Sequence, residues 1–526
     1  MQLVKWKSKP RSQKMFSFLA MLVTVVAFLL VAGRGIAADD NACTVVPDEI
    51  ILSWTENPET TQTIAWRTGT DINGNQAQYM PAAGADADFA CAQEAAATRS
   101  DLYPGYFHYE VILQGLTPGA SYVYRVGREG AWSAPAFFTT ASTIDNFSFI
   151  YMGDVQQGYE EWGNMLQVVA AEKSGPKFAL LGGDLVDDSN NSIEWQQFFG
   201  AATPVFKQIP IMPATGNHDD TPLFWDSFAL PRNGPEGLEE KFYSFDYGNC
   251  HIVVLNSNYL GTPAAADYGK ISAWLCNDLN NNGKQWKFIV LHYPPYPAAP
   301  DGYAANLQEN WVPLFEQGQV DAVFVGHQHI YMRTKPLRNN QVQADGQGIV
   351  YIMGNAGTKY YDVGPNYGYI AEEIANVSNY EVISINGDTF SLTAKDDGGQ
   401  VMDSYAFKKQ PGAGSAIYTV TPIVDAAYQS GKTADGISTM TVNSSVFGLK
   451  YFGAQVTPVR THSELEAVVF VHSRSGAQQS LSVTKADFDV VHTAQAGFNV
   501  QPGDVVKIYV VDDLTNAVDF NPTILQ

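Results

Sequence analysis

The sequence is poor in cysteine: it has four in 526 residues, and no two of them stand at the short spacing of a zinc site. A thiolate metal centre is therefore not indicated. Outside the cytosol, Cys43 and Cys91 can form a disulfide within the first domain, with free thiols as the alternative. Cys250 opens an apolar strand and Cys276 lies on the apolar face of an expected helix, so buried free thiols and a bridge both stay open for this pair.

The sequence is also short of positive charge. It has 31 Lys and Arg against 54 Asp and Glu, a net charge of −23, and no basic stripe. Such a field repels polyanions, so nucleic-acid binding is not expected. An acidic enzyme that acts on an anionic substrate needs bound cations to reverse the local field. Hydrophobic residues make up 45% of the chain, enough for large cores, and the length predicts two to four domains.

Long apolar runs are absent except for one near the start of the sequence. Residues 1–14 carry five basic residues and no acid, and residues 15–33 are almost entirely apolar. Small residues around Ala37 and Ala38 resemble a signal-peptidase site, so residues 1–38 are predicted to be a cleaved export signal. The run is also just long enough to cross a bilayer, which leaves an uncleaved anchor as the alternative. Both alternatives predict a secreted, periplasmic or cell-envelope protein.

The rest of the sequence divides into three parts that differ in the spacing of their hydrophobic residues. Residues 39–143 contain short strand-like runs separated by turn residues, which is typical of a β-sandwich. Residues 144–409 alternate strand and helix patterns and predict an α/β sheet. Residues 410–415 are rich in Pro and Gly and indicate a linker. Residues 410–526 then return to short alternating strands, so a C-terminal all-β domain of unknown role is expected.

Polar side chains follow the ends of the apolar strands in the α/β part. Asp154, Asp184 and Asn217 stand 30 and 33 residues apart, about one strand–helix–strand unit, so they are expected on neighbouring strands. Further candidates follow later strands: His292, His327 and His329. Because the carboxyl ends of strands in an α/β sheet face one crevice, these groups are predicted to meet there. Oxygen and imidazole donors without thiolates suit Mn, Fe or Zn.

Two motifs carry a resemblance to a known family: Gly216-Asn217-His218-Asp219 and Gly326-His327-Gln328-His329-Ile330-Tyr331. Together with the strand-end residues they resemble the calcineurin-like metallophosphoesterase superfamily, in its purple acid phosphatase-like branch. Leu52-Ser53-Trp54 resembles part of the fibronectin type III-like domain that precedes the catalytic domain in those phosphatases. The resemblance implies an α/β fold, the metallophosphoesterase four-layer α/β/β/α sandwich, flanked by an N-terminal fibronectin type III-like β-sandwich and a C-terminal all-β domain.

The resemblance also implies metal ligands. Asp184 is expected to bridge two ions. The other ligands are expected to be Asp154 and His329 on the first ion and Asn217, His292 and His327 on the second. The sequence departs from the family at two positions near the first ion. Gln156 stands where the superfamily often has a His ligand, and is expected to offer an oxygen instead. Asp187 stands where purple acid phosphatases have a tyrosine ligand. It is expected either to bind the metal or to accept a hydrogen bond from a residue that does.

The function that the resemblance implies is hydrolysis of small-molecule phosphate esters by an exported enzyme with two divalent or trivalent transition-metal ions, Fe, Mn or Zn. A phosphomonoesterase is expected, in which a metal-bound hydroxide attacks phosphorus directly and no phosphoenzyme forms. His218 is expected to protonate the leaving group, with Asp219 orienting it. The alternatives are a phosphodiesterase or nucleotide hydrolase with the same centre, and a non-catalytic envelope binding protein associated through its C-terminal domain. The intact ligand positions count against the last alternative.

Overall fold

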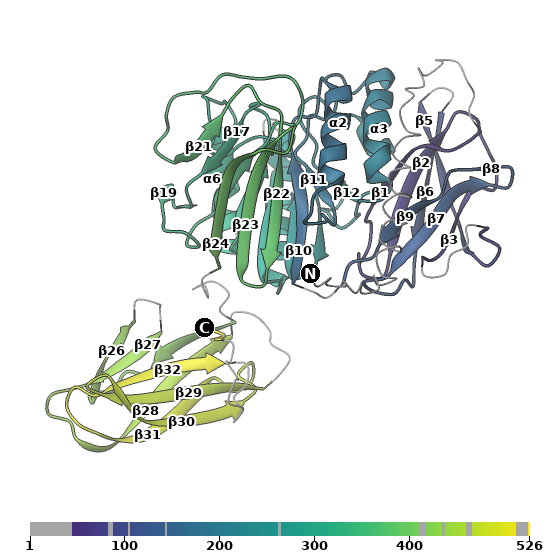
Figure 1. The fold of residues 1–526 in the computed structure, drawn as a ribbon. Coiled ribbons are helices and arrows are strands. Elements are labelled where there is room, and N and C mark those ends of the chain that lie inside the picture. Colours follow the sequence, from purple (N-terminus) through teal and green to yellow (C-terminus); the bar gives the residue numbers. More distant parts are fainter. Residues whose placement is uncertain are drawn as a thin grey trace, which may run out of the picture. The chain divides into compact units, whose positions relative to one another are not determined.

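The structure is a computed structural model that describes residues 45–82, 88–103, 106–142, 145–260, 265–409, 417–433, 437–458, 465–511 and 524–526 (Figure 1). The expected export signal, Cys43 and the 410–415 linker lie outside the described residues. The described cysteines are free thiols: Cys91 is exposed, Cys250 buried and Cys276 half-buried. None of the helices in the described part of the chain has the length and apolar character needed to cross a membrane.

The N-terminal part is a sandwich of two antiparallel sheets. The sheets have the orders β1-β2-β6-β5 and β4-β3-β7-β8, with β9 paired to β7. Aromatic and β-branched side chains, among them Trp66 and Tyr109, alternate inward and fill the space between the sheets. The strands are β1 (Asp48–Ser53), β2 (Gln62–Thr68), β3 (Gln76–Pro81), β4 (Gln93–Ala96), β5 (Thr98–Tyr103), β6 (Tyr106–Leu113), β7 (Ser121–Arg128), β8 (Ala131–Trp132) and β9 (Ala136–Thr139).

The middle part holds two larger sheets. A six-stranded sheet has the order β12-β11-β10-β22-β23-β24, with β10, β11 and β12 parallel. Its strands are β10 (Asn146–Met152), β11 (Ala179–Leu181), β12 (Ile211–Pro213), β22 (Asn379–Asn386), β23 (Thr389–Asp396) and β24 (Val401–Lys408). A seven-stranded sheet has the order β13-β14-β15-β16-β20-β17-β21, with β14, β15, β16 and β20 parallel. Its strands are β13 (Tyr243–Tyr247), β14 (Cys250–Val254), β15 (Trp286–Val290), β16 (Ala322–Val325), β17 (Tyr331–Thr334), β20 (Val350–Met353) and β21 (Ile370–Ile374). A short hairpin, β18 (Leu337–Arg338) and β19 (Gln341–Val342), forms a two-stranded sheet of its own and is bridged to Ile349, just before β20.

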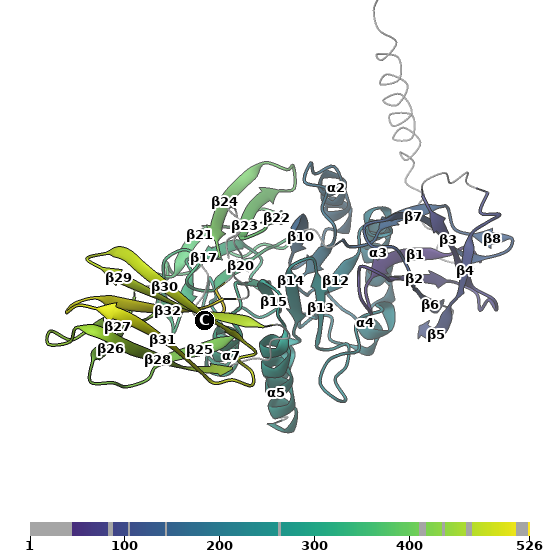
Figure 2. The ribbon, with the colours of Figure 1, turned by 90° about the horizontal axis from the view of Figure 1, so that it is seen from below.

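Helices cover the outer faces of these two sheets. The α2 helix buries Trp162, Met165, Leu166 and Val169, one stripe at helical spacing, in the core that contains the six-stranded sheet. Along β14, Ile252 belongs to the core between the sheets and Val253 to a second core with Leu275 of α5. Figure 2 shows the layers in order from α2 through β10 and β15 to α5. The described helices are α2 (Tyr159–Ala170), α3 (Ser192–Phe206), α4 (Pro222–Ser227), the 3₁₀ turn η1 (Ser257–Leu260), α5 (Ala265–Asn281), α6 (Ala304–Asn310) and α7 (Val312–Gly318).

This arrangement confirms the predicted four-layer α/β/β/α sandwich. The C-terminal part is also all β, as predicted, and has its own core around Phe452, Phe470 and Ile508. Its two sheets have the orders β25-β28-β31 and β26-β27-β32-β29-β30. The strands are β25 (Tyr418–Pro422), β26 (Tyr428–Lys432), β27 (Ser438–Val442), β28 (Gly448–Pro458), β29 (Glu466–Arg474), β30 (Ala477–Ala486), β31 (Thr493–Val500) and β32 (Val505–Val511).

Candidate metal centre

The predicted ligands follow the carboxyl ends of parallel strands. Asp154, Asp184 and Asn217 come after β10, β11 and β12, while His292 and His327 come after β15 and β16. Because parallel strands end at the same edge of a sheet, the connections after them meet on one side of each sheet. The two sheets face each other across the central core, so both sets of connections converge on one place.

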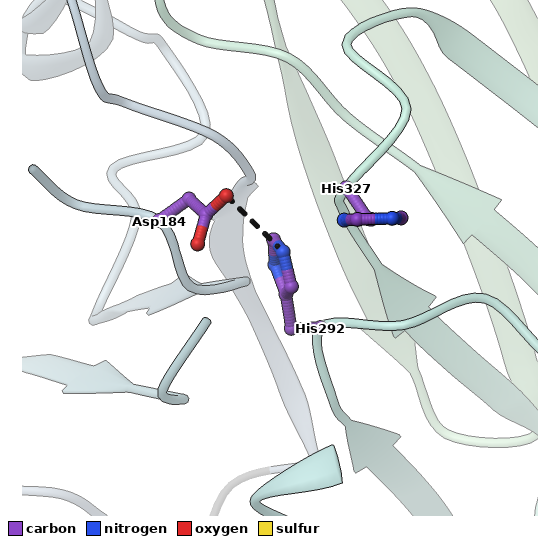
Figure 3. A group of neighbouring side chains, drawn as sticks. All are labelled: Asp184, His292 and His327. Carbon is purple, nitrogen blue, oxygen red and sulfur yellow. Dashed lines mark ion pairs between the residues drawn. The ribbon is translucent and has the colours of Figure 1, made fainter. Parts of the chain in front are cut away.

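The convergence produces two groups of candidate ligands that share one carboxylate. Asp184, His292 and His327 form one group, and Asp154, Asp184 and His329 form the other, with ligand atoms within 4.8 Å of one another in each. Asp184 Oδ2 lies 3.3 Å from His292 Nε2, the pair drawn in Figure 3. Asp154 Oδ1 lies 3.8 Å from His329 Nε2. The position of Asp184 in both groups matches its expected bridging role.

The three candidate histidine ligands, His292, His327 and His329, each have one ring nitrogen close to an acceptor on the side away from the centre. His292 Nδ1 donates to the carbonyl oxygen of Gly182 at 2.9 Å. His329 Nδ1 lies 3.3 Å from Asn355 Oδ1, and His327 Nε2 lies 3.5 Å from Asp301 Oδ2. The other nitrogen of each ring therefore points inward. Metal-binding histidines commonly have this second partner, because it fixes the tautomer that presents a lone pair to the ion.

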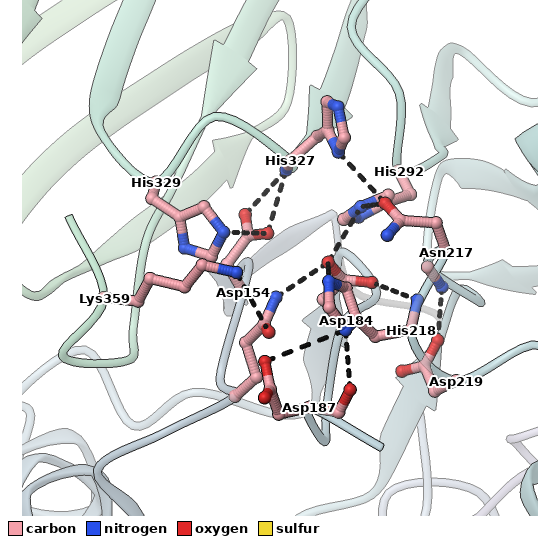
Figure 4. Close-up of polar contacts among 12 residues, drawn as sticks. Asp154, Asp184, Asp187, Asn217, His218, Asp219, His292, His327, His329 and Lys359 are labelled. Atoms are coloured by element: carbon pink, nitrogen blue, oxygen red, sulfur yellow. Dashed lines mark hydrogen bonds and ion pairs between the residues drawn. The ribbon is translucent and has the colours of Figure 1, made fainter. Parts of the chain in front are cut away.

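The amide oxygen and the ring nitrogens that point toward the centre lie within hydrogen-bond distance of one another. Asn217 Oδ1 lies 3.0 Å from His292 Nε2 and 3.1 Å from His327 Nδ1. In their neutral forms these three atoms have lone pairs and no proton between them, so the arrangement is satisfied by a metal ion or by a proton on His292. Figure 4 shows these side chains directed at one another. The donors are carboxylate, amide and imidazole with no thiolate, which fits Mn, Fe or Zn. The residues present thus fit the metal centre that the sequence predicts.

The electrostatics of the buried groups also favour cations. Burial lowers the pKa of His292, but the charges of Asp184 and Asp154 outweigh it and raise that pKa to about 10. Burial raises the pKa of Asp184, but the charge and hydrogen bond of His292 outweigh it and lower the pKa well below its usual value. Burial and the charge of His292 lower the pKa of His327 to about 3. The Asp184 carboxylate is therefore favoured in its charged form where ions are expected, whereas burial and the charge of Asp184 raise the pKa of Asp154.

The backbone around the ligands is strained. Asp154, Asp184, His327 and His329 have φ values of 49°, 52°, 77° and 49°, a left-handed conformation that costs an ordinary residue about 1–2 kcal/mol. Two glycines make room for the carboxylates. A Cβ at Gly216 would lie 2.1 Å from Asp184 Oδ1, and a Cβ at Gly326 would lie 2.6 Å from Asp154 Oδ2. The glycines of both sequence motifs are therefore needed for space.

Gln156 and Asp187, the two departures from the family pattern, lie at different distances from the ligands. Gln156 is buried and its Nε2 donates to Asp184 Oδ2 at 2.8 Å, so its amide touches the shared carboxylate. Its role as an oxygen ligand stays a prediction. The Asp187 side chain is 43% exposed and belongs to neither of the two groups found among the described residues. Its Oδ1 instead lies 3.7 Å from His218 Nδ1.

His218 and Asp219 lie beside the shared carboxylate but do not act as the expected pair. His218 Nδ1 lies 2.6 Å from the carbonyl oxygen of Asp187, and Nε2 lies 4.0 Å from Asp184 Oδ2. The ring is therefore held by Asp187 and faces the centre. Asp219 is buried, and its two oxygens accept from the backbone amides of Leu185 and Gly216 at 2.6 and 2.5 Å. The expectation that Asp219 orients His218 is corrected: among the described residues each Asp219 oxygen accepts from a backbone amide and none from His218, so Asp219 ties together the two ligand-bearing loops.

A pocket of about 290 Å³ opens beside His327. Its lining includes Asp301, Tyr303, His327, Gln328, Tyr361 and Asp362. The ring of Tyr361 packs edge-on against His329 with centroids 4.6 Å apart, so this tyrosine borders the centre. Asn355, Asp301 and Lys359 were missed from the sequence. They lie on loops without a motif, and a single sequence gives no signal for them.

Comparisons with known proteins match two parts of the chain. Residues 47–140 match the family model for the N-terminal domain of purple acid phosphatase, and residues 147–331 match that for calcineurin-like phosphoesterase. The uncharacterized protein Rv2577 of Mycobacterium tuberculosis is 27% identical over 332 residues, covering 55% of this chain and 62% of that protein. Purple acid phosphatase 22 of Arabidopsis thaliana is 28% identical over 277 residues, covering 48% of this chain and 61% of the relative. The matched region thus spans less than two thirds of these relatives.

Solved structures support the fold. The purple acid phosphatase from yellow lupin seeds superposes with a TM-score of 0.57 at 19% identity, covering 69% of this chain and 74% of that one. The structure of PhoD gives a TM-score of 0.53 at 11% identity, covering 70% and 91%. The two solved structures share the two-sheet sandwich of the middle part. Residues 47–140 and 147–331 are thus similar to the N-terminal domain of purple acid phosphatase and to calcineurin-like phosphoesterase, and a metal-dependent phosphatase is the enzyme class that these matches support.

Proposed function

We propose that this protein is a metal-dependent phosphatase that hydrolyses small phosphate monoesters. The observation that carries the proposal is the pair of ligand groups that share Asp184, with the His218 ring facing the same carboxylate. Asp154, Asp184, His329 and Gln156 would hold the first ion, and Asp184, Asn217, His292 and His327 the second. When bound, such ions supply Lewis acidity, which lowers the pKa of water and offsets the charge on phosphoryl oxygens. Fe, Mn and Zn all suit these donors.

The residues of the chain have separate tasks in this reaction. His292, His327 and His329 are held from behind by Gly182, Asp301 and Asn355, which fixes the place where the phosphoryl group is bound. His218 donates a proton from Nε2 to the leaving oxygen, because its Nδ1 is already committed to the carbonyl of Asp187. The backbone bonds of Asp219 keep the loops of Asp184 and Asn217 at a constant separation.

The alcohol part of the substrate would occupy the pocket beside His327. A volume of about 290 Å³ suits a small organic group and excludes a folded macromolecule. Two carboxylates, Asp301 and Asp362, lie in its lining, which disfavours leaving groups that carry further negative charge.

A substrate panel with metal analysis tests the proposal. The purified protein should contain two transition-metal ions and hydrolyse p-nitrophenyl phosphate faster than bis(p-nitrophenyl) phosphate or ATP. Chelation should abolish the activity, and adding Fe, Mn or Zn back should restore it. Faster hydrolysis of the diester or of ATP would favour the alternative enzymes. Full activity in a metal-free preparation would sink the mechanism, and metal-loaded protein inactive on all three substrates would favour a binding protein.

Export is proposed on the sequence alone. The basic residues 1–14, the apolar residues 15–33 and the small residues near Ala37 support it. Fractionation of cells that make the full chain, followed by N-terminal sequencing of the product, tests both location and cleavage. Recovery of the uncleaved chain in the cytosol would contradict the proposal.

A further inference from the structure

The loop that follows β20 brings an ammonium group to the edge of the metal centre. Lys359 lies on this loop, and its Nζ donates to Gln156 Oε1 at 3.4 Å. Figure 4 shows the side chain directed toward Asp154. The charge of Lys359 is one of the influences that lower the pKa of His329 to about 4, although burial is the largest, so the group lies within electrostatic reach of this ligand.

The position of Lys359 is fixed by the same residue that holds a ligand. Asn355 is buried, and its Oδ1 lies 3.3 Å from His329 Nδ1. Its Nδ2 donates to the carbonyl oxygens of Gly357 and Lys359 at 3.3 and 3.1 Å. One side chain therefore orients both the histidine and the backbone that carries the ammonium group. Lys359 is half-buried, so part of the residue is open to solvent while its backbone is held by Asn355.

The ammonium group has capacity left for a ligand. A lysine head group can donate three hydrogen bonds. Across the described residues, Gln156 is its one hydrogen-bond acceptor, Nζ lies 5.8 Å from the centroid of the Tyr361 ring, and no ion pair of Lys359 with a carboxylate is found. A half-buried cation next to an ion-binding site, with two donors free, is suited to bind an anionic oxygen.

We infer that Lys359 binds a non-bridging oxygen of the substrate phosphoryl group and thereby selects phosphomonoesters over phosphodiesters. This inference rests on the proposed phosphatase function and names the residue that sets its substrate class. A monoester has three non-bridging oxygens and close to two negative charges at neutral pH, whereas a diester has two such oxygens and one charge. An added cation therefore stabilises the monoester more than the diester.

Replacing Lys359 with Met removes the charge while keeping much of the side-chain volume. In the metal-loaded K359M protein, kcat/KM for p-nitrophenyl phosphate should fall about 10- to 100-fold, the usual effect of losing a charged hydrogen bond. The value for bis(p-nitrophenyl) phosphate should fall less than about 3-fold on the same scale. The dissociation constant of inorganic phosphate, measured by calorimetry, should rise in parallel with the monoester loss. Metal content should stay at the wild-type value.

Two variants serve as controls. K359R keeps the charge and should retain most of the monoester activity. K177M makes the same exchange at an exposed lysine of the same domain and should change neither ester. Equal losses for both esters, unchanged phosphate affinity, or loss of metal from K359M would overturn the inference, since each points to a structural role. Wild-type protein that hydrolyses neither ester would count against the proposed function instead, and phosphate calorimetry would still test Lys359.

Discussion

Gly326 and Asp154 lie so close together that a Cβ at Gly326 would come within 2.6 Å of the carboxylate oxygen Oδ2. The same Cβ would also lie 3.1 Å from the carbonyl of Gly182 and 3.2 Å from His292 Nδ1. Backbone atoms and buried side chains surround this Cβ, so there is no space for a side chain at position 326.

The first prediction concerns this contact. Gly326→Ala should displace Asp154 and weaken metal binding by about 10- to 100-fold, the usual effect of disturbing a ligand's support. Metal content after dialysis, measured by mass spectrometry, checks this. Gly200→Ala is the matched control, because a Cβ at Gly200 in α3 meets nothing within 4 Å. Retention of two tightly bound ions by the Gly326 variant would show that Asp154 is not needed as a ligand.

The second prediction concerns His218. Its replacement by Ala should leave metal content nearly intact and lower turnover by roughly 100-fold or more, as for loss of a general acid. The loss should be smaller for esters of nitrophenol than for esters of aliphatic alcohols, because a good leaving group needs little protonation. Steady-state kinetics with both kinds of ester measure the difference. His492→Ala, at an exposed histidine of the C-terminal part, should be neutral. Losses of equal size for both ester types would argue against proton donation by His218.

The third prediction concerns Asp219 and tests whether its role in turnover differs from that of His218. Asp219→Asn keeps one acceptor oxygen and turns an NH₂ group toward a backbone amide, which should lower stability by about 1–3 kcal/mol. Because the residue holds loops rather than the His218 ring, its effect on turnover should be the same for good and poor leaving groups. Denaturant unfolding and the same two esters provide the measurements. A loss that grows with leaving-group pKa would return Asp219 to the role of orienting the acid.

The fourth prediction is a pH dependence of stability at His251. Burial lowers the pKa of His251, but hydrogen bonds to Asp246 and Asp278, at 2.7 and 2.9 Å, outweigh it and raise the pKa above 6.5. The folded state therefore binds this proton more tightly than the unfolded state. The resulting stabilisation is complete below pH 6.5 and is lost as the pH rises through the folded-state pKa.

His251→Gln tests that sign, because glutamine can donate a hydrogen bond but cannot carry the charge. The difference in Tm between the wild type and the variant should be largest in mildly acid buffer and should shrink in alkaline buffer. His492→Gln should show no such trend. A Tm difference that grows with pH would mean that His251 is buried in its neutral form.

The fifth prediction is optical. In purple acid phosphatases the colour comes from a tyrosinate bound to ferric iron, and Asp187 occupies that position here. Hard carboxylate and amide oxygens do not give such a band, so the oxidised, iron-loaded protein should lack it. Visible absorption spectra of iron-loaded protein decide the matter. A purple band would show that a tyrosine binds the iron, and Tyr361, packed against His329, would be the first to replace with Phe.

The convergence of the candidate ligands could be predicted because each follows an apolar strand and most lie in recognisable motifs. His292, for example, can be identified from its position just after β15 and from the family pattern. The residues behind the ligands were not predictable in the same way. Asn355 and Asp301 reach their histidines only because two loops, separate in sequence, fold over the same edge of the sheets.

Asp219 was identified from the sequence, but the partner expected for it was not the one found. It stands next to His218 in the sequence, and adjacency suggested a pair, but neighbouring side chains in this turn point apart. Its partners, Gly216 and Leu185, include one 34 residues away. The need for glycine at 216 and 326 likewise depends on distances across the site, which local sequence does not contain.

Asp184 belongs to both candidate ligand groups, so two ions bound there would be thermodynamically linked. An ion held by one group would use charge that the other group also needs, and the second ion would meet a carboxylate already partly neutralised. The factor by which the first ion changed the affinity for the second would equal the factor by which the second changed the affinity for the first. Metal loading would then follow two macroscopic constants that describe the pair of groups together.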